Sequence, residues 1–271
     1  MICLTFDIEE RFHSHLTPLD STRSWSASSR ISAIIDWLVE NEKEATFFVV
    51  SELAEKYPEL IRKMSDNNFE IASHSHTHLK ISDDNKSKNL EEIHKAKSIL
   101  ENISGRSVVG FRAPSWSANI AHHWLWEHLE KLGFKYDSSL FPFKTYLYGS
   151  NKNPIEPFMI SENLVEIPPS VYELGSLRIP YGGGFYFRAF PLWITNLLIS
   201  SNRKINRNSM LYFHPWEFDK PLEVLEKSFS EKIIGNYNVK NNWKRTTKFL
   251  NNYKTTTVIN YLEILGDISK K

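Results

Sequence analysis

Four short stretches of the chain carry side chains that could act together, and each lies at the end of an apolar run. In TFDIEE, Asp7 and Glu9 would point to the same side of a strand, because strand side chains alternate. HSHTH at 74–78 offers three histidines, GFRAPSWS contains Arg112, and LYFHPWE contains His214. Two imidazoles and a carboxylate form a common ligand set for a divalent ion, with positions left open for water or substrate.

The spacing of the histidines leaves two arrangements open. In an extended strand all three rings of HSHTH would share one face, whereas a helical turn would pair only His74 and His78. Taken singly, Arg112 is uninformative and His214 is best interpreted as a packed or capping residue. Taken together, several reactive groups at strand ends favour a shared site, in which the arginine could hold a carboxylate ionised.

The elements expected to position these residues alternate between strands and helices. Apolar, β-rich runs predict strands at 2–7, 45–50, 69–73, 107–114, 210–217 and 255–259. Helical patterns predict helices at 27–41, 51–65, 86–103, 118–133 and 190–200. The alternation indicates parallel βαβ units, hence an α/β barrel or a doubly wound sheet.

Residues 140–188 interrupt this alternation with several prolines and a run of three glycines. We expect a long irregular excursion, which in a compact domain is usually functional or mobile. Its aromatic residues could line a substrate groove. The chain, 1–271, is otherwise expected to form a single domain.

Composition narrows the class of protein. Of the 271 residues 41% are hydrophobic, and 33 Lys+Arg against 32 Asp+Glu give a net charge of +1, so nucleic acid is not an expected partner. The single cysteine, Cys3, excludes an internal disulfide. No run approaches the roughly 18 apolar residues of a membrane span. The first ten residues lack the apolar core of a signal peptide, which predicts a soluble, cytoplasmic protein.

In chain order, the four stretches resemble the motifs of the polysaccharide deacetylases that share the NodB homology domain, carbohydrate esterase family four. TFDIEE is similar to TFDDG, HSHTH to H-(S/T)-x-x-H, RAP to R-x-P and LYFH to L-x-x-H, over about residues 4–217. FDIE, YDSSLFP, GGGFYFR and HPWE resemble a branch associated with bacterial exopolysaccharide and surface-glycan loci. The resemblance implies an α/β fold, a distorted (β/α) barrel of the NodB type with about seven strands.

The resemblance also implies roles for the four stretches. Asp7 matches the general base, and His74 and His78 match the paired metal ligands. Glu9 takes the place of the family's carboxylate ligand, although it is a glutamate and lies one position further along. Glu10 is the alternative ligand, but alternation should turn it away. The backbone after β-rich FEIAS should curl so that His76 faces elsewhere.

Arg112 matches the residue that orients the base, and His214 matches the general acid. The family's pair that orients this acid histidine has no clear counterpart, and Asp137 is the candidate for it. The RAP motif continues with Ser115 instead of the family's tyrosine, whose backbone N–H helps to hold the oxyanion. Substrate or oxyanion contacts are expected from Ser115, Trp116, Asp137, Tyr186 and Arg188.

The activity implied is metal-dependent removal of an N-acetyl group from an acetamido sugar of a bacterial surface polysaccharide or its precursor. Zn²⁺ is the expected ion, although Co²⁺ or other divalent ions suit the same ligands. The expected partner is a carbohydrate that carries N-acetyl groups. Two alternatives stay open: an allantoinase-like hydrolase of ureides or cyclic imides on the same fold, and a catalytically silent glycan-binding protein.

Overall fold

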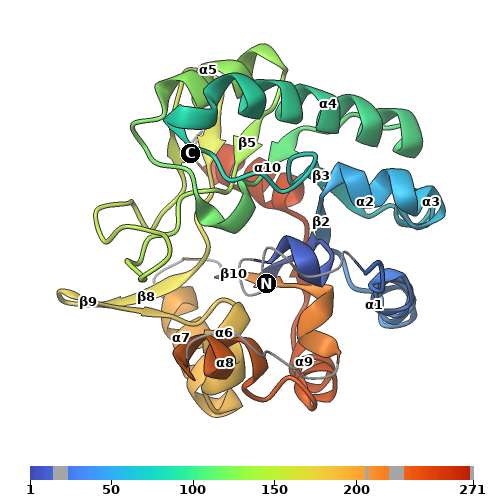
Figure 1. Cartoon of the computed structure of the whole chain (residues 1–271). Coiled ribbons are helices and arrows are strands. Elements are labelled where there is room, and N and C mark those ends of the chain that lie inside the picture. Colours follow the sequence, from blue (N-terminus) through green and yellow to red (C-terminus); the bar gives the residue numbers. More distant parts are fainter. Residues whose placement is uncertain (15–23, 205–206, 208, 220–228, 269–271) are drawn as a thin grey trace. The chain divides into compact units, whose positions relative to one another are not determined.

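The computed structural model describes residues 1–14, 24–204, 207, 209–219 and 229–268 of the chain. These residues belong to two compact units. The first combines Met1–Ala45 with Tyr181–Lys271, and the second is Thr46–Pro180. In the first unit, elements from both ends of the sequence therefore fold together (Figure 1). That one catalytic domain extends over 1–271 stays a prediction.

The first unit is built on β1 (Ile2–Ile8), a strand whose residues are all buried. β10 (Ser209–Phe213) runs parallel to β1, with Ile2 opposite Ser209 and Phe6 opposite Phe213. β11 (Thr255–Thr256) also pairs with β1 in parallel. Because parallel strands end at the same edge of a sheet, the residues that follow β1 and β10 come close together.

The described part of the first unit also contains helices. They are α1 (Ser28–Glu40), α6 (Gly184–Ala189), α7 (Leu192–Lys204), α8 (Phe229–Asn236), α9 (Asn242–Leu250) and α10 (Val258–Ile268), with the 3-10 turns η1 (Arg11–His13) and η4 (Pro215–Phe218). Of these helices, α10 contacts β1 and α7 contacts β10. α1 buries Ile31, Ile34, Ile35 and Leu38. The apolar face predicted for 27–41 is thus confirmed.

The second unit contains a mostly parallel sheet. In order, its strands are β2 (Thr46–Val49), β3 (Glu70–Ser73), β4 (Gly110–Phe111), β5 (Tyr136–Asp137), β7 (Val165–Glu166) and β6 (Phe158–Met159). β6 is antiparallel to β7, and the other neighbours are parallel. The predicted strand–helix alternation is confirmed here, although β4 is much shorter than 107–114.

The helices of the second unit cover this sheet. They are α2 (Ser51–Lys56), α3 (Pro58–Asp66), α4 (Lys86–Ser104) and α5 (His123–Lys131), with the 3-10 turns η2 (Asp83–Asn85) and η3 (Pro114–Trp116). α3 and α4 pack against β3, and α4 also lies beside α2 and α3 (Figure 1). The single helix predicted at 51–65 is divided at Tyr57, because Pro58 disfavours helical backbone in the residue before it.

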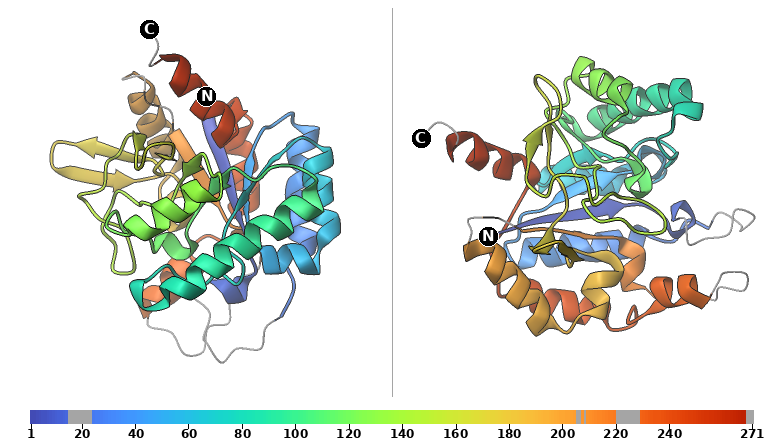
Figure 2. Two further views of the ribbon diagram at one scale, coloured as in Figure 1. Left: turned by 90° about the horizontal axis from the view of Figure 1, so that it is seen from above. Right: turned by 90° about the vertical axis from the view of Figure 1, so that its left-hand side faces the viewer.

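The segment 140–188 is only partly irregular, contrary to the prediction. Residues 138–157 contain no helix or strand, but β6 and β7 follow. A hairpin of β8 (Val171–Leu174) and β9 (Leu177–Pro180) then extends as a two-stranded ribbon (Figure 2). Its Gly-Ser loop has Gly175 at a φ of 61°, which two-residue hairpin turns require. A Gly-Ser pair between two β-rich runs is a hairpin signal that the sequence prediction missed.

Two other predicted strands end early. The strand predicted at 210–217 stops at Phe213, because Pro215 cannot donate to a ladder and instead begins η4. The strand predicted at 255–259 is limited to β11, and Val258 begins the helix α10. The 3-10 turn η4 replaces the end of the first predicted strand, and the α-helix α10 replaces the end of the second.

Candidate active site

Asp7 and Glu9 lie at the carboxyl end of β1, two positions apart. They are buried, with 2% and 3% of their surface exposed. Oδ2 of Asp7 lies 3.7 Å from Nε2 of His214. Oε1 of Glu9 accepts a hydrogen bond of 2.9 Å from the indole N–H of Trp216. Each carboxylate therefore has a partner in the segment that follows β10.

Glu10 points elsewhere, as the alternation predicted. Its Oε1 accepts hydrogen bonds from the backbone N–H groups of Ser26 at 2.9 Å and Ala27 at 2.8 Å. The carboxylate thus fixes the chain just before α1. Burial raises the pKa of Glu10, and these hydrogen bonds partly oppose the rise. A carboxylate that already holds two backbone N–H groups is poorly placed to bind a metal ion. Glu9 is therefore favoured over Glu10 as the candidate carboxylate ligand.

The ring of His214 is held on two sides. Its Nδ1 lies 2.6 Å from Oε1 of Glu217, and its face stacks on Trp216 with ring centroids 4.9 Å apart. The other oxygen of Glu217 accepts a hydrogen bond of 3.0 Å from Nε of Arg188. Arg188 also donates to two backbone carbonyls, those of Ile234 and Tyr237, at 2.8 and 2.6 Å. A buried arginine therefore fixes the glutamate that fixes the histidine.

This environment keeps His214 protonated above neutral pH. Burial lowers the pKa of His214, but the hydrogen bond with Glu217 and the charges of Glu9, Glu217 and Asp7 outweigh it and raise the pKa to about 9. Burial raises the pKa of Glu217, but its bond to His214 and the charge of Arg188 bring it below the usual value. A protonated imidazole beside a carboxylate can supply a proton donor and a proton acceptor to one reaction.

The contacts of two predicted residues differ from those their predicted roles require. Arg188 is only 2% exposed, and its guanidinium donates to Glu217 and to backbone carbonyls, a position that suits support of the site. The group that orients His214 is Glu217, whereas the carboxylate of Asp137 accepts hydrogen bonds from Ser139. The local signal for Glu217 was present, since a histidine and a glutamate three residues apart flank Pro-Trp in HPWE.

In the second unit, β3 ends at Ser73 and the HSHTH stretch curls, as predicted for an H-S-x-x-H motif. The curl consists of bends, with Ser75 and His78 at φ values of 67° and 62°, and not of a helical turn. The rings of His74 and His78 lie edge to face with centroids 5.0 Å apart. His76 is turned toward α2, where its Nδ1 lies 2.8 Å from the hydroxyl of Ser51.

The tautomer of His74 suits a metal ligand. Its Nδ1 lies 2.8 Å from the backbone carbonyl oxygen of Arg112. Because a carbonyl oxygen only accepts, Nδ1 donates the proton, and in the neutral ring Nε2 then carries the lone pair that a metal ion requires. Two imidazoles at the end of one strand are donors that fit Zn²⁺ or a similar ion. His76 makes a different contact, and burial lowers its pKa.

Glu92 of α4 stabilises the curl that carries these histidines. It accepts hydrogen bonds from the backbone N–H of Thr77 at 2.7 Å, from the Thr77 hydroxyl at 2.8 Å and from the Ser75 hydroxyl at 3.3 Å. The sequence prediction missed this residue. A glutamate in a polar helix has no distinguishing signal until α4 is packed against β3.

Arg112 is completely buried after β4. Its guanidinium carbon lies 3.9 Å from the ring centroid of Phe48 and 4.7 Å from that of Trp116. Its Nε and Nη2 donate to the carbonyl and the hydroxyl of Ser138 at 3.2 and 3.1 Å. Ser115 and Trp116 have positive φ values of 53° and 51°, so the chain turns sharply after RAP. A cation fixed in this way can hold a carboxylate ionised.

Two other residues that were predicted to contact substrate, Asp137 and Tyr186, differ in burial. Asp137 forms a fully buried pair with Glu166, and burial followed by the charge of Asp137 raises the pKa of Glu166 well above its usual value. Tyr186 of α6 is half-buried, and burial raises the pKa of its hydroxyl. Substrate contacts by Tyr186 and Ser115 stay predictions.

Residues 1–136 match the family model described as polysaccharide deacetylase, and residues 138–263 match a domain of unknown function, DUF3473. A curated relative, the peptidoglycan-N-acetylglucosamine deacetylase of Bacillus cereus, is 28% identical over 81 residues, 30% of this chain and 30% of that protein. The chain spans about a third of the length of the curated relatives it matches, 30% and 34% of two of them.

Two solved structures are similar over most of the chain. One, from Mycobacterium smegmatis and assigned as a polysaccharide deacetylase, has a TM-score of 0.58 and 24% identity and covers 79% of this chain and 77% of its own. The other, from Pseudomonas aeruginosa with the same assignment, has a TM-score of 0.59 and 16% identity. It covers 95% of this chain and 87% of its own. At these identities the likeness concerns the fold, and it confirms the expected α/β class of the NodB type.

Proposed function

Because the chain belongs to the polysaccharide deacetylase family, we propose that it is a metal-dependent N-deacetylase. The proposed substrate is an acetamido sugar of a bacterial surface polysaccharide or of its precursor. One observation carries the proposal: His214 lies 2.6 Å from Glu217 and 3.7 Å from Asp7. Amide hydrolysis requires a proton donor and a proton acceptor, and the ends of β1 and β10 supply both.

The proposed metal ligands are Glu9, His74 and His78. Two imidazoles and one carboxylate are a set that zinc enzymes use with open positions for water and substrate. When bound, a divalent ion polarises the acetamide carbonyl and supplies a water of lowered pKa. The family motifs and the proton position on His74 support this set, and Zn²⁺ or Co²⁺ suits it.

The proposed proton transfers use the chain's own residues. Asp7 accepts the proton of the attacking water, and His214 donates a proton to the departing nitrogen. Glu217 keeps His214 charged and oriented, as its distance of 2.6 Å supports. Arg112 is the proposed positioning residue for the base. The backbone N–H of Ser115 is the proposed donor to the oxyanion.

The test is acetate release from a panel of N-acetylated glycans, with and without a metal chelator. We expect release that the chelator abolishes and that added Zn²⁺ or Co²⁺ restores. Release that is insensitive to metal removal would refute the metal-dependent mechanism. Ring opening of ureides without acetate release would favour the amidohydrolase alternative. Glycan binding without stoichiometric metal or turnover would favour the silent binding protein.

The cell compartment in which the enzyme acts determines which form of the glycan it meets. Among the described helices none is long and apolar enough to cross a membrane. The cytoplasmic location expected from the sequence stays a prediction. A cytoplasmic enzyme would act on a precursor and not on the exported polymer. Fractionation of cells that express the full chain would show where the protein lies and hence which of the two forms is its substrate.

A further inference from the structure

Two carboxyl groups lie side by side in the interior of the second unit. Asp137 ends β5 and Glu166 ends β7, and the parallel pairing of these strands sets the two residues opposite each other. Both side chains are fully buried, and a hydrogen bond joins them. Because buried like charges repel each other, the pair shares one proton. Burial and the charge of Asp137 raise the pKa of Glu166 well above its usual value, so Glu166 carries that proton.

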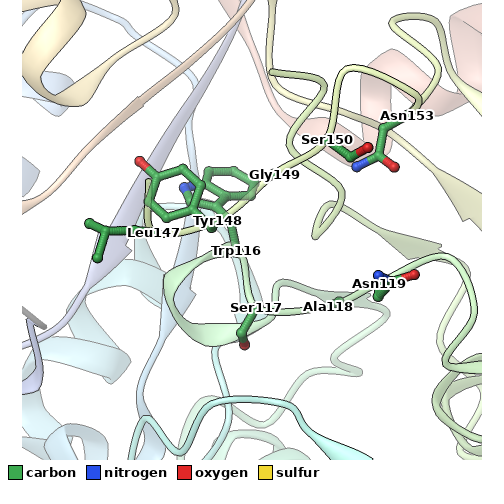
Figure 3. A pocket seen from close by; sticks show the side chains of 9 residues that line it. All are labelled: Trp116, Ser117, Ala118, Asn119, Leu147, Tyr148, Gly149, Ser150 and Asn153. Atoms are coloured by element: carbon green, nitrogen blue, oxygen red, sulfur yellow. The ribbon is translucent and has the colours of Figure 1, made fainter. Parts of the chain in front are cut away.

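This carboxyl pair is not placed to touch a ligand. A pocket of about 230 Å³ lies in the same unit, where the turn after RAP meets the segment 147–153, and Trp116 and Tyr148 are among the residues that line it (Figure 3). Asp137 and Glu166 do not line this pocket, and both are buried. Any effect of the pair on a reaction must therefore pass through the groups that it binds.

The pair is one end of a chain of hydrogen bonds that leads to a proposed metal ligand. The hydroxyl of Ser139 donates to Oδ1 of Asp137 at 2.6 Å, and its oxygen accepts from the backbone N–H of Ala113 at 2.7 Å. That N–H belongs to the same peptide group as the carbonyl of Arg112. The carbonyl oxygen of Arg112 accepts a hydrogen bond from Nδ1 of His74 at 2.8 Å. One peptide group therefore joins the imidazole on one side to the serine and the carboxylate on the other.

All the hydrogen bonds of this chain point the same way. The imidazole N–H donates to the carbonyl, the peptide N–H donates to the serine, and the serine O–H donates to the carboxylate. Aligned hydrogen bonds strengthen one another in an interior of low dielectric constant. A carboxylate bound directly to a ligating histidine makes the metal-binding nitrogen more basic. Here the serine and the peptide group extend that effect from Asp137 to Nε2 of His74.

The segment after β5 also fixes the position of this peptide group. The backbone N–H groups of Ser139 and Leu140 donate to the carboxyl pair at 3.1 and 3.0 Å. The guanidinium of Arg112 donates to the carbonyl and the hydroxyl of Ser138. The backbone N–H of Arg112 donates to the carbonyl of Ser73 at 2.9 Å. The peptide group that follows Arg112 is therefore held between the ends of β3 and β5.

We propose that the carboxyl pair and Ser139 are positioning residues for the metal ligand His74, to which the peptide group after Arg112 connects them. The inference rests on the proposed function, since it takes His74 as a metal ligand. Asp137 supplies the negative charge, Glu166 keeps the pair at a single charge, and Ser139 passes the effect to the peptide group. None of these three is a proposed ligand. Their contribution is to the orientation of the ring and to the affinity of the site for its ion.

The test compares Ser139→Ala with the matched control Ser65→Ala. Ser65 is a buried serine of the same unit whose hydroxyl donates to the carbonyl of Ser104 at 2.8 Å, so its replacement removes one hydrogen bond of the same kind. Calorimetry on the metal-free protein measures the affinity for Zn²⁺ and for Co²⁺, and thermal unfolding measures stability. We expect Ser139→Ala to weaken the metal affinity about tenfold, as the loss of an outer partner of a ligating histidine does. Ser65→Ala should keep the wild-type affinity.

A second variant, Asp137→Asn, keeps the size of the side chain and one acceptor oxygen but removes the charge. It should weaken the metal affinity severalfold. In the metal-free protein it should also move the Nδ1 proton resonance of His74 upfield, because a weaker hydrogen bond deshields the proton less. If Ser139→Ala does not fold, these two measurements on Asp137→Asn decide the question.

The outcomes separate this inference from the proposed function. Wild-type metal affinity in Ser139→Ala, or an unchanged His74 resonance in Asp137→Asn, would overturn the inference while metal-dependent acetate release upheld the function. Equal weakening by Ser139→Ala and Ser65→Ala would indicate a general loss of stability and would also overturn it. Affinity that only Ser139→Ala weakens, in a protein that releases no acetate, would support the inference and refute the function.

Discussion

Replacing Glu217 with glutamine should move the alkaline limb of the pH–rate profile to lower pH. Glu217 is fully buried, and its Oε1 lies 2.6 Å from Nδ1 of His214. Glutamine keeps the size of the side chain and one acceptor oxygen but loses the charge that stabilises the imidazolium. A general acid works only while it is protonated, so the rate falls as pH rises through the pKa of His214.

The size of the effect follows from the surroundings of His214. Its pKa is raised from 6.5 to about 9, a difference of about 3 kcal/mol in favour of the protonated form. Glu217 supplies both a hydrogen bond and a charge, while Glu9 and Asp7 supply charge alone. Removing one opposite charge at this range lowers a pKa by about 1–3 units. The stability that this raised pKa contributes is complete below pH 6.5 and is lost as pH rises through about 9.

The assay is kcat/KM for acetate release by the metal-loaded protein across neutral and alkaline pH. An NMR titration of His214 reads the same pKa without turnover. Glu263→Gln, an exposed glutamate of the same unit, is the matched control. Because Glu217→Gln leaves the buried Arg188 without its carboxylate, thermal unfolding of the variant must be recorded, with about 3–5 kcal/mol of destabilisation expected. A folded variant whose alkaline limb stays at the wild-type pH would refute the reasoning.

Three further predictions concern other parts of the chain. Asp7→Asn should lower acetate release by about 10²–10⁴-fold, since the base is lost, while metal analysis still finds the ion; full activity would contradict the assignment. Glu92→Gln should weaken metal binding by about 10–100-fold through the loosened curl, and chelator competition with unchanged affinity would argue against it. The raised pKa of Glu166 means that its contribution to stability is lost as pH rises through that pKa. Glu166→Gln should therefore lessen the fall of the melting temperature as pH rises above 4.5, the ordinary pKa of this carboxyl, and an unchanged fall would show that the buried pair with Asp137 does not cause it.

Several features could be predicted from the sequence because they depend on local geometry. Alternation along β1 was enough to place Asp7 and Glu9 together and to turn Glu10 away. The histidine spacing left two arrangements open, and the resemblance to the H-(S/T)-x-x-H motif predicted the curl that brings the ring centroids of His74 and His78 to 5.0 Å. Both features involve only a few consecutive residues, so that alternation in the first case and a short motif in the second were sufficient to predict them.

Local signals were also misjudged where a turn residue stood inside an apolar or polar run. Pro58 divides a predicted helix and Pro215 ends a predicted strand, since each lacks an N–H and restricts its neighbour. Gly175 makes a hairpin inside a segment that was expected to be irregular. In each case the residue responsible is visible in the sequence, so the element boundary follows from a local signal.

Other features were decided by tertiary structure alone. The ion pair of Arg188 with Glu217 joins residues 29 positions apart, and Glu92 reaches Thr77 only because α4 packs against β3. Arg112 is enclosed by rings from two different elements. No spacing rule connects such residues, because their distance depends on how helices pack on a sheet and on which buried charges find partners. The sequence by itself therefore determined which groups could react. Tertiary packing decided which neighbouring residues orient these groups and set their protonation states.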